Sequence, residues 1–301
     1  TVSVGAPVDG PCVVDLGSRA MAAEDAAAAA SSVDVAPSGW TAHKMDSTLR
    51  GNWAAEVRAR RARSGCRVVV LPAWPALGRT CVGGVVHVHG APIGSVLEHL
   101  PEARLVGTAD ALQEWLAGDG AVVVCDIADD EAMQAMATTA ADSQNVVLVG
   151  PAGPLGAAFA ARFGAGRAVA APVLDGPVLV VRGSANPVSL EQIARLAAAC
   201  ADVTIIAAPD AEGPLHAGVA HDLAVAAHDA VARLQPSVVV LLGGDTAAAY
   251  LGDAPRLVGG TVAAGMPWSR DVHGGGPLVI TKAGGFGGPD ALVELFSPRG
   301  A

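Results

Sequence analysis

Residues 238–251 read Val-Val-Val-Leu-Leu-Gly-Gly-Asp-Thr-Ala-Ala-Ala-Tyr-Leu, and this stretch indicates the fold class. Five consecutive aliphatic residues are typical of a strand that is buried on both faces. Gly243 and Gly244 then predict a tight turn, and Asp245 or Thr246 is a residue type that begins a helix as its N-cap. We therefore expect a strand, a sharp turn and a helix, which is the repeating unit of a parallel α/β sheet.

The same alternation recurs along the chain. Further short apolar runs lie at 12–15, 67–71, 121–126, 145–149, 178–182, 203–207 and 278–281. Ala-rich segments with helical spacing lie between them, at 24–31, 52–63, 129–141, 190–199 and 221–234. Gly and Pro then interrupt the chain over 164–177 before a new strand begins. We predict an α/β protein of two domains, 1–172 and 173–301, with mostly parallel sheets flanked by helices and the active site in the interdomain cleft.

Length, composition and charge exclude several classes of protein. The chain has 301 residues, of which 51% are hydrophobic and 16% charged, and this composition excludes disorder as the main state. Its formal net charge of −10 would repel nucleic acid and membrane surfaces, and no apolar run reaches the ~18 residues of a membrane span. Five cysteines without a Cys-x-x-Cys pair, and no secretory segment at the start, favour a cytoplasmic protein.

Lysine occurs at only two positions, Lys44 and Lys282, although the chain has 19 basic residues. Both lie in segments rich in glycine and hydroxyl groups. An ammonium group binds phosphate or carboxylate oxygens as a point charge, so both lysines are candidate ligand-binding residues. The alternative is that both are ordinary surface lysines.

A dense group of polar residues surrounds Lys44, just before the helix predicted at 52–63. Ser47 and Arg50 suit a small polyhydroxy acid, because a cation can hold a carboxylate and a hydroxyl can bind a hydroxyl. Asp46 could accept the proton of a hydroxyl that attacks phosphorus, so Asp46 and Lys44 are the candidate catalytic residues. The alternative is a helix cap beside a solvated lysine.

Two further cations follow predicted strands. Arg79 comes after the strand at 67–71, and Arg19, next to Ser18, comes after the strand at 12–15. Both are candidate substrate-binding residues for this reason. His87 and His89 would share one face of a strand, but no third ligand stands at a diagnostic spacing, so we expect an ordinary hairpin pair and no resident metal site.

Glycine loops follow three strands of the second half. They are Gly183-Ser184, Gly243-Gly244 and Gly284-Gly-Phe-Gly287. Oriented backbone amides at such turns, together with a helix dipole, favour an anion such as a nucleotide phosphate. None of the loops has the Walker or the complete Gly-x-Gly-x-x-Gly pattern, and a plain chain reversal is the alternative for each.

These segments together resemble the four-carbon acid sugar kinase family, whose members phosphorylate acids such as threonate, erythronate or 3-oxo-tetronate with ATP. The resemblance extends from residue 12 to the end of the chain. It rests on Val14-Asp-Leu-Gly-Ser-Arg19, Lys44-Met-Asp-Ser-Thr-Leu-Arg-Gly-Asn52, Pro72-Ala-Trp-Pro-Ala-Leu-Gly-Arg-Thr80, Val180-Val-Arg-Gly-Ser184, Gly243-Gly-Asp-Thr-Ala247, Gly265-Met-Pro267 and Thr281-Lys-Ala-Gly-Gly-Phe-Gly287.

The resemblance implies an N-terminal domain that binds the acid sugar and a C-terminal domain that binds the nucleotide. The residues implied to face the substrate are Lys44, Asp46, Ser47, Arg50 and Arg79. Those implied to hold ATP, which is used with Mg²⁺, are Ser184, Gly243, Gly244, Asp245, Thr246 and Gly285. Gly284 and Lys282 lie in the same loop, and Lys282 could steady the transferred charge.

Departures from the family pattern motivate an alternative function. The family's opening strand and acidic loop have no counterpart, so the first domain is expected to lack its first strand-helix unit. The motifs around Leu16-Gly17 and Gly150-Pro-Ala-Gly-Pro-Leu155 are also altered. The alternative is therefore a divergent, catalytically weak or inactive member that binds nucleotide or sugar acid. An unpaired strand at the edge of the sheet would favour a homodimer.

Overall fold

The computed structural model describes residues 2–4, 12–33, 40–164, 172–209, 217–263 and 265–296. The chain forms two compact units, which we call the N-terminal unit (residues 16–167) and the C-terminal unit (residues 1–15 and 168–301). This division differs from the predicted one at its first segment. Residues 1–15 belong to the C-terminal unit, because β1 (Val2–Val4) pairs antiparallel with β14 (Arg256–Ala263) and parallel with β2 (Val13–Asp15).

The N-terminal unit is built on a five-stranded sheet in which all neighbouring strands are parallel, in the order β3-β10-β4-β9-β8. These strands are β3 (Thr41–Lys44), β4 (Arg67–Val70), β8 (Arg104–Val106), β9 (Val122–Cys125) and β10 (Val146–Gly150). Its helices are α1 (Ala23–Ser32), α2 (Trp53–Ser64), α3 (Val96–His99), α4 (Ala109–Ala117), α5 (Asp130–Ala141) and α6 (Ala152–Phe163), with short 3-10 turns at Ser18–Ala20 and Pro75–Leu77.

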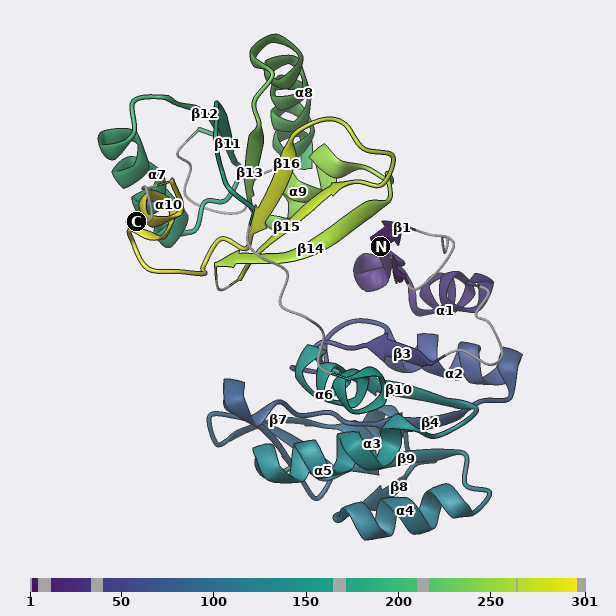
Figure 1. Ribbon diagram of the computed structural model, residues 1–301. Helices are drawn as coiled ribbons and strands as arrows, with labels where there is room; N and C mark the ends of the chain where they lie inside the picture. The colour runs from purple at the N-terminus through teal and green to yellow at the C-terminus, as the bar shows by residue number, and fades with distance from the viewer. Residues whose placement is uncertain are drawn as a thin grey trace. The chain divides into compact units, whose positions relative to one another are not determined.

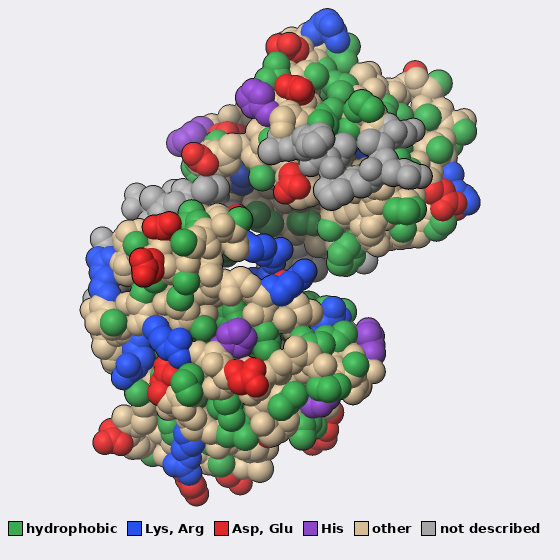
Figure 2. Space-filling model, turned by 180° about the vertical axis from the view of Figure 1, so that it is seen from behind, with side chains coloured by type: hydrophobic (Ala, Val, Ile, Leu, Met, Phe, Trp, Pro, Cys, Tyr) green, Lys and Arg blue, Asp and Glu red, His purple; other side chains and the backbone are tan. Residues whose placement is uncertain are grey.

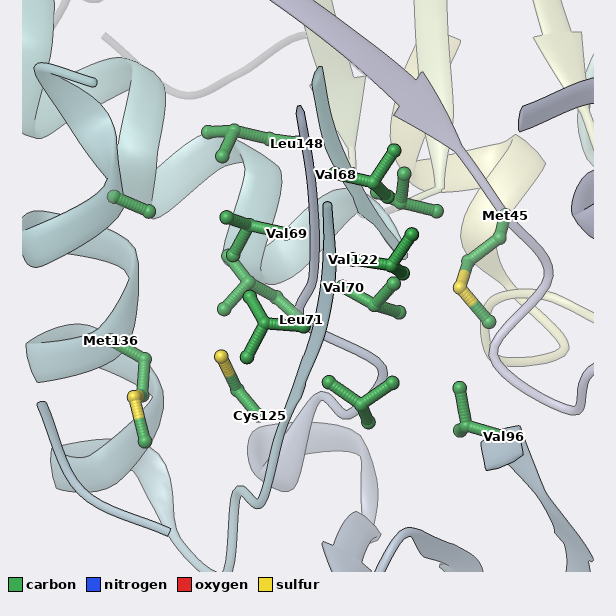
Figure 3. Close-up of a cluster of buried hydrophobic side chains, with 14 of the residues drawn as sticks. Met45, Val68, Val69, Val70, Leu71, Val96, Val122, Cys125, Met136 and Leu148 are labelled. Atoms are coloured by element: carbon green, nitrogen blue, oxygen red, sulfur yellow. The ribbon is translucent and has the colours of Figure 1, made fainter. Parts of the chain in front are cut away.

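The parallel sheet of this unit is buried on both faces, as its continuous apolar strands predict. Side chains alternate along β4, so Val69 and Leu71 lie on the same side as Met136 of α5 (Figure 3). Val68 and Val70 point the other way, toward Met45. Each of these β4 side chains is fully buried, so helices on both sides of the sheet exclude water from it.

A second, antiparallel sheet of three strands accompanies the first. It consists of β5 (Arg79–Val82), β6 (Val85–Val88) and β7 (Ala91–Ser95). His87 lies within β6 and His89 in the turn that follows it, where φ is 49°. Among the described residues, no group of three or more His, Cys, Asp or Glu side chains could hold a metal ion.

The C-terminal unit is a mixed eight-stranded sheet in the order β12-β11-β13-β16-β15-β14-β1-β2. Its remaining strands are β11 (Val178–Arg182), β12 (Val203–Ala207), β13 (Val238–Leu242), β15 (Met266–Asp271) and β16 (Leu278–Lys282). Its helices are α7 (Pro187–Ala199), α8 (Ala217–Leu234), α9 (Gly244–Leu251) and α10 (Ala291–Phe296). Helices α7 and α10 lie on one face of the sheet and α8 and α9 on the other (Figure 1).

The predicted fold class is confirmed: parallel-dominated sheets are flanked by helices in two units. The antiparallel β14–β15 pair was not predicted, and of the β5–β7 sheet only the hairpin around His87 and His89 was expected. In the described ranges, no helix combines the length and apolarity that crossing a bilayer takes. Basic and acidic side chains lie interspersed on the face of the molecule shown in Figure 2.

Candidate functional site

The Asp46 carboxylate is the centre of the polar cluster in the N-terminal unit. Strand β3 ends at Lys44, and the chain then turns, with the Leu49 amide donating to the Asp46 carbonyl at 3.0 Å. Asp46 Oδ1 accepts hydrogen bonds from the Thr48 amide (2.8 Å) and the Thr48 hydroxyl. Leu49 has a left-handed φ of 64°, and the Trp53 indole donates to its carbonyl at 3.3 Å. Burial and these bonds fix the turn despite the backbone strain.

Two guanidinium groups converge on the same carboxylate. Arg19 Nη2 lies 3.1 Å from Asp46 Oδ2, and Arg50 Nη2 lies 3.0 Å from that oxygen. The Asp46 side chain is 12% exposed, whereas Arg19 and Arg50 are 68% and 69% exposed. The partly buried Asp46 carboxylate therefore holds two arginines whose guanidinium groups stay accessible, an arrangement suited to binding a second carboxylate or a phosphate.

The donors around Asp46 also determine its charge. Burial by itself raises the pKa of this carboxyl group, but the hydrogen bonds from Thr48 and Arg50 outweigh it and hold the pKa well below its usual range. A carboxylate this acidic and this fully hydrogen-bonded is a weak general base. The hydrogen bonds to Asp46 fit a positioning role, and its predicted role as proton acceptor stays a prediction.

A buried network on α2 explains how Arg19 reaches Asp46. Glu56 lies 2.8 Å from His43 Nε2, both side chains being 7% exposed, and it also accepts a hydrogen bond from the Ser18 hydroxyl. The side-chain amide of Asn52 donates through Nδ2 to the carbonyls of Ser18 and Met21, at 2.9 Å each. The turn that carries Arg19 is therefore fastened to α2 on both sides.

Sequence reasoning missed His43 and Glu56. The signal that could have found Glu56 is its position, because it shares the buried face of α2 with Trp53 and Val57, at helical spacing. A carboxylate on such a face requires partners inside the protein. The partner His43 gives no comparable signal, because it lies on β3, a strand that the sequence did not predict.

The other predicted residues of this unit lie as follows. Lys44 is exposed at the end of β3 and, within the described part of the chain, has no ion-pair partner. Ser47 is half-buried in the turn between Asp46 and Thr48. Arg79 begins β5, where its Nη1 donates to the Leu77 carbonyl while its buried Nε has no partner among the described residues.

In the C-terminal unit, sheet order brings the three glycine loops together. Strands β11, β13 and β16 are parallel neighbours, so their last residues, Arg182, Leu242 and Lys282, stand side by side. The amides of Gly183 and Ser184 both donate to the Leu242 carbonyl at 3.1 Å. The loops after all three strands therefore meet at one edge of the sheet, where parallel sheets bind their ligands.

The close approach of neighbouring side chains explains why glycine occupies two positions in these loops. A Cβ on Gly183 would overlap the Thr246 hydroxyl, and one on Gly284 would overlap the Ser184 hydroxyl. Gly243 has a φ of 115° and is the N-cap of α9, so the helix begins at Gly244, earlier than predicted, because glycine permits this turn. Asp245 is exposed on the first turn of α9, whereas Thr246 is 2% exposed.

Lys282, predicted as a residue that could steady transferred charge, is buried beneath its loop. Its side chain is 2% exposed, and Nζ donates to the carbonyls of Ala283 (3.1 Å) and Gly284 (3.2 Å). Burial lowers the pKa of the Lys282 ammonium group. In this structure Lys282 supports the loop from inside, whereas Gly285 is exposed, as are most other residues of the loop.

Comparison with known proteins agrees with this architecture. Residues 3–104 match the family model of a sugar-binding N-terminal domain. The chain is 30% identical to D-threonate kinase of Bordetella bronchiseptica over 83% of this chain and 76% of that protein. It is 29% identical to D-threonate kinase of Cupriavidus necator over 77% of this chain, and it spans 63% of the length of that relative.

A solved structure from Haemophilus influenzae covers 98% of the chain with a TM-score of 0.77 at 18% identity, which supports the fold. The fold and the site define a class of protein with two α/β units. One unit carries an arginine cluster, and the other carries three glycine loops. The chain belongs to the four-carbon acid sugar kinase family.

Proposed function

We propose that this protein is an ATP-dependent kinase that phosphorylates the terminal hydroxyl of a four-carbon acid sugar of the threonate, erythronate or 3-oxo-tetronate type. The observation that carries the proposal is the pair of exposed guanidinium groups held on the partly buried Asp46 carboxylate. The names of the D-threonate kinase relatives support the same substrate class.

The N-terminal unit binds the acid in this proposal. Arg19, Arg50 and Lys44 supply positive charge for the substrate carboxylate, and Asp46 fixes the two arginines. Ser47 offers a hydroxyl partner to the substrate, and Arg79 supplies a further cation. Holding the acid in one orientation is the main catalytic contribution of such residues, because phosphoryl transfer requires little covalent chemistry from the protein.

The C-terminal unit binds ATP in this proposal. The phosphates of ATP suit the backbone amides at the start of α9, because the first N–H groups of a helix have no acceptor within the helix. Ser184, Gly243, Gly244, Thr246, Gly284 and Gly285 form the surrounding loops. Mg²⁺ bound with ATP neutralises phosphate charge, and the exposed Asp245 carboxylate is the residue of these loops suited to contact it.

The test is ADP release with Mg-ATP across a panel of four-carbon aldonates and 3-oxo-aldonates, using Lys44→Ala as the comparison variant. Substrate-dependent turnover that Lys44→Ala abolishes supports the kinase and identifies its substrate. An absence of turnover, together with calorimetric binding of ATP or an acid sugar, would instead support the divergent binding protein that the altered motifs suggest.

A further inference from the structure

The loop after β16 has an unusual backbone orientation, which buried side chains impose. Residues 283–288 form this loop, and its carbonyl groups accept hydrogen bonds from three side chains beneath it. Ser189 and Gln192 of α7 are 0% exposed, and Lys282 is 2% exposed. The donors therefore lie on the interior side of the loop.

The contacts reach four of the six carbonyls of the loop, those of residues 283, 284, 286 and 288. The Ser189 hydroxyl donates to the Gly284 carbonyl at 2.8 Å, a carbonyl that Lys282 also contacts at 3.2 Å. Gln192 Nε2 donates to the carbonyls of Phe286 (3.1 Å) and Gly288 (2.7 Å). Lys282 further donates to the Ala283 carbonyl at 3.1 Å.

Peptide geometry converts these contacts into an outward row of amides. In a planar trans peptide, the carbonyl of one residue and the N–H of the next point in opposite directions. Carbonyls of residues 283, 284 and 286 that point inward therefore turn the amides of Gly284, Gly285 and Gly287 outward. Among the described residues, these three amides have no hydrogen-bond acceptor. The Gly284 and Gly285 amides are consecutive, and successive outward N–H groups form a concave site for an anion, whereas the Phe286 amide donates to the Ala283 carbonyl at 3.2 Å.

We propose that Ser189, Gln192 and Lys282 are positioning residues that hold the 283–288 loop with its amides outward, so that the loop can bind a nucleotide phosphate. The inference rests on the proposed function, and it gives a positioning role to residues that do not contact the ligand themselves. It also explains why Lys282 is buried: its ammonium group orients amides instead of contacting phosphate directly.

The test measures calorimetric binding of ATP and of inorganic triphosphate to the full chain and to Ser189→Ala and Gln192→Met variants. Each substitution removes donors worth about 1 kcal/mol net apiece, and 1.4 kcal/mol corresponds to tenfold. We expect ATP affinity to fall about fivefold to tenfold and the KM for ATP to rise equally, while the KM for the acid sugar stays unchanged. Hydrogen exchange of the 283–288 amides should accelerate in both variants without ligand.

Ser269→Ala is the matched control, because Ser269 is also a buried serine of the C-terminal unit but lies on β15. Equal loss of ATP affinity in Ser269→Ala, or unchanged affinity in folded Ser189→Ala and Gln192→Met, would overturn the inference. Should Ser189→Ala fail to fold, Ser189→Cys keeps the side-chain volume with a weaker donor and takes its place.

The two proposals fail in different ways. A wild-type protein that binds ATP without turning over any acid contradicts the kinase but leaves the role of the loop intact, as long as the variants bind less tightly. A wild-type protein that binds neither ATP nor triphosphate overturns the role of the loop.

Discussion

Two carboxylates act differently in the N-terminal unit, although they lie on neighbouring segments. The partly buried Asp46 gathers the exposed cations Arg19 and Arg50, which form the proposed ligand-binding surface. Glu56 gathers His43 and Ser18 in the interior, so its bonds fasten segments together. Each carboxylate is stabilised as an anion by its donors, which compensate for the cost of burial.

Replacing Asp46 with Asn should impair substrate binding more than ATP binding. Hydrogen bonds to charged groups are worth about 1.5–3 kcal/mol, so we expect the KM for the acid sugar to rise roughly 10- to 100-fold. Steady-state kinetics with each substrate varied in turn would check this. Asp142→Asn is the control, because Asp142 forms a surface pair with Arg162. A rise in the KM for ATP alone would contradict the assignment.

Glu56 should make stability depend on pH. Burial raises the pKa of Glu56, but hydrogen bonds from His43 and Ser18 outweigh it and hold the pKa below the ordinary 4.5. A carboxyl whose folded pKa is lowered contributes stability above its unfolded pKa, and this contribution is lost as pH falls through the folded value. Urea unfolding should therefore show wild type and Glu56→Gln differing most above pH 4.5 and converging below it.

The surface variant Glu102→Gln provides the comparison for Glu56. Glu102 pairs with Arg58 and is 41% exposed, so its removal should cost only about 0–1 kcal/mol. Glu56→Ala, which leaves buried partners without an acceptor, should cost about 3–5 kcal/mol at neutral pH. Equal effects of the two truncations would show that the buried network adds nothing beyond a surface pair.

At the scale of elements, the contact between the loop after β11 and helix α9 shapes the candidate nucleotide loops. Gly183 follows β11 directly, and its missing side chain leaves room for the buried Thr246 hydroxyl on α9. The turn at Gly243 brings α9 to this point. The loop is thus shaped by helix packing as well as by strand order.

Gly183→Ala should push the loop after β11 away from helix α9. A methyl group there overlaps the Thr246 hydroxyl, and overpacking of a buried contact costs about 1–3 kcal/mol. We expect a lower thermal midpoint and weaker ATP binding, measured by calorimetry. Gly218→Ala on α8 has open space around its Cβ and should lower neither quantity. Unchanged ATP affinity in Gly183→Ala would contradict the packing argument.

At the scale of the whole molecule, the two units differ in how the chain builds them. The N-terminal unit is one continuous segment, residues 16–167, with its own hydrophobic core on both faces of its sheet. The C-terminal unit joins residues 1–15 to residues 168–301, so its eight-stranded sheet depends on strands distant in sequence.

A fragment of residues 16–167 should fold by itself. Its core requires no other segment, so we expect cooperative urea unfolding with a stability in the usual range of about 5–15 kcal/mol. Residues 168–301 alone lack β1, which covers the edge of β14, and should melt at a lower temperature than the same unit in the full chain. A non-cooperative transition in the 16–167 fragment would contradict this view.

The sequence by itself determined many of the local elements, although not strands such as β3, β14 and β15. The predicted strands at 178–182, 203–207 and 238–242 have the observed bounds, and the helix predicted at 129–141 begins one residue later. Such elements follow from apolar periodicity and from residues near in sequence, which a reader of the sequence can see. The loops after β11, β13 and β16 were predictable for the same reason, because they follow recognisable strands.

Only the tertiary structure decided which segments meet. It paired β1 with β14, fastened Ser18 to Glu56, and turned Lys282 into the interior. Partners such as His43 and Glu56 stabilise the folded protein only when distant segments pack together. Nothing in their immediate sequence neighbourhood therefore signals the pairing. The ligand-binding roles proposed for single residues depend on these long-range contacts, because packing decides which charged groups face solvent and which stay buried.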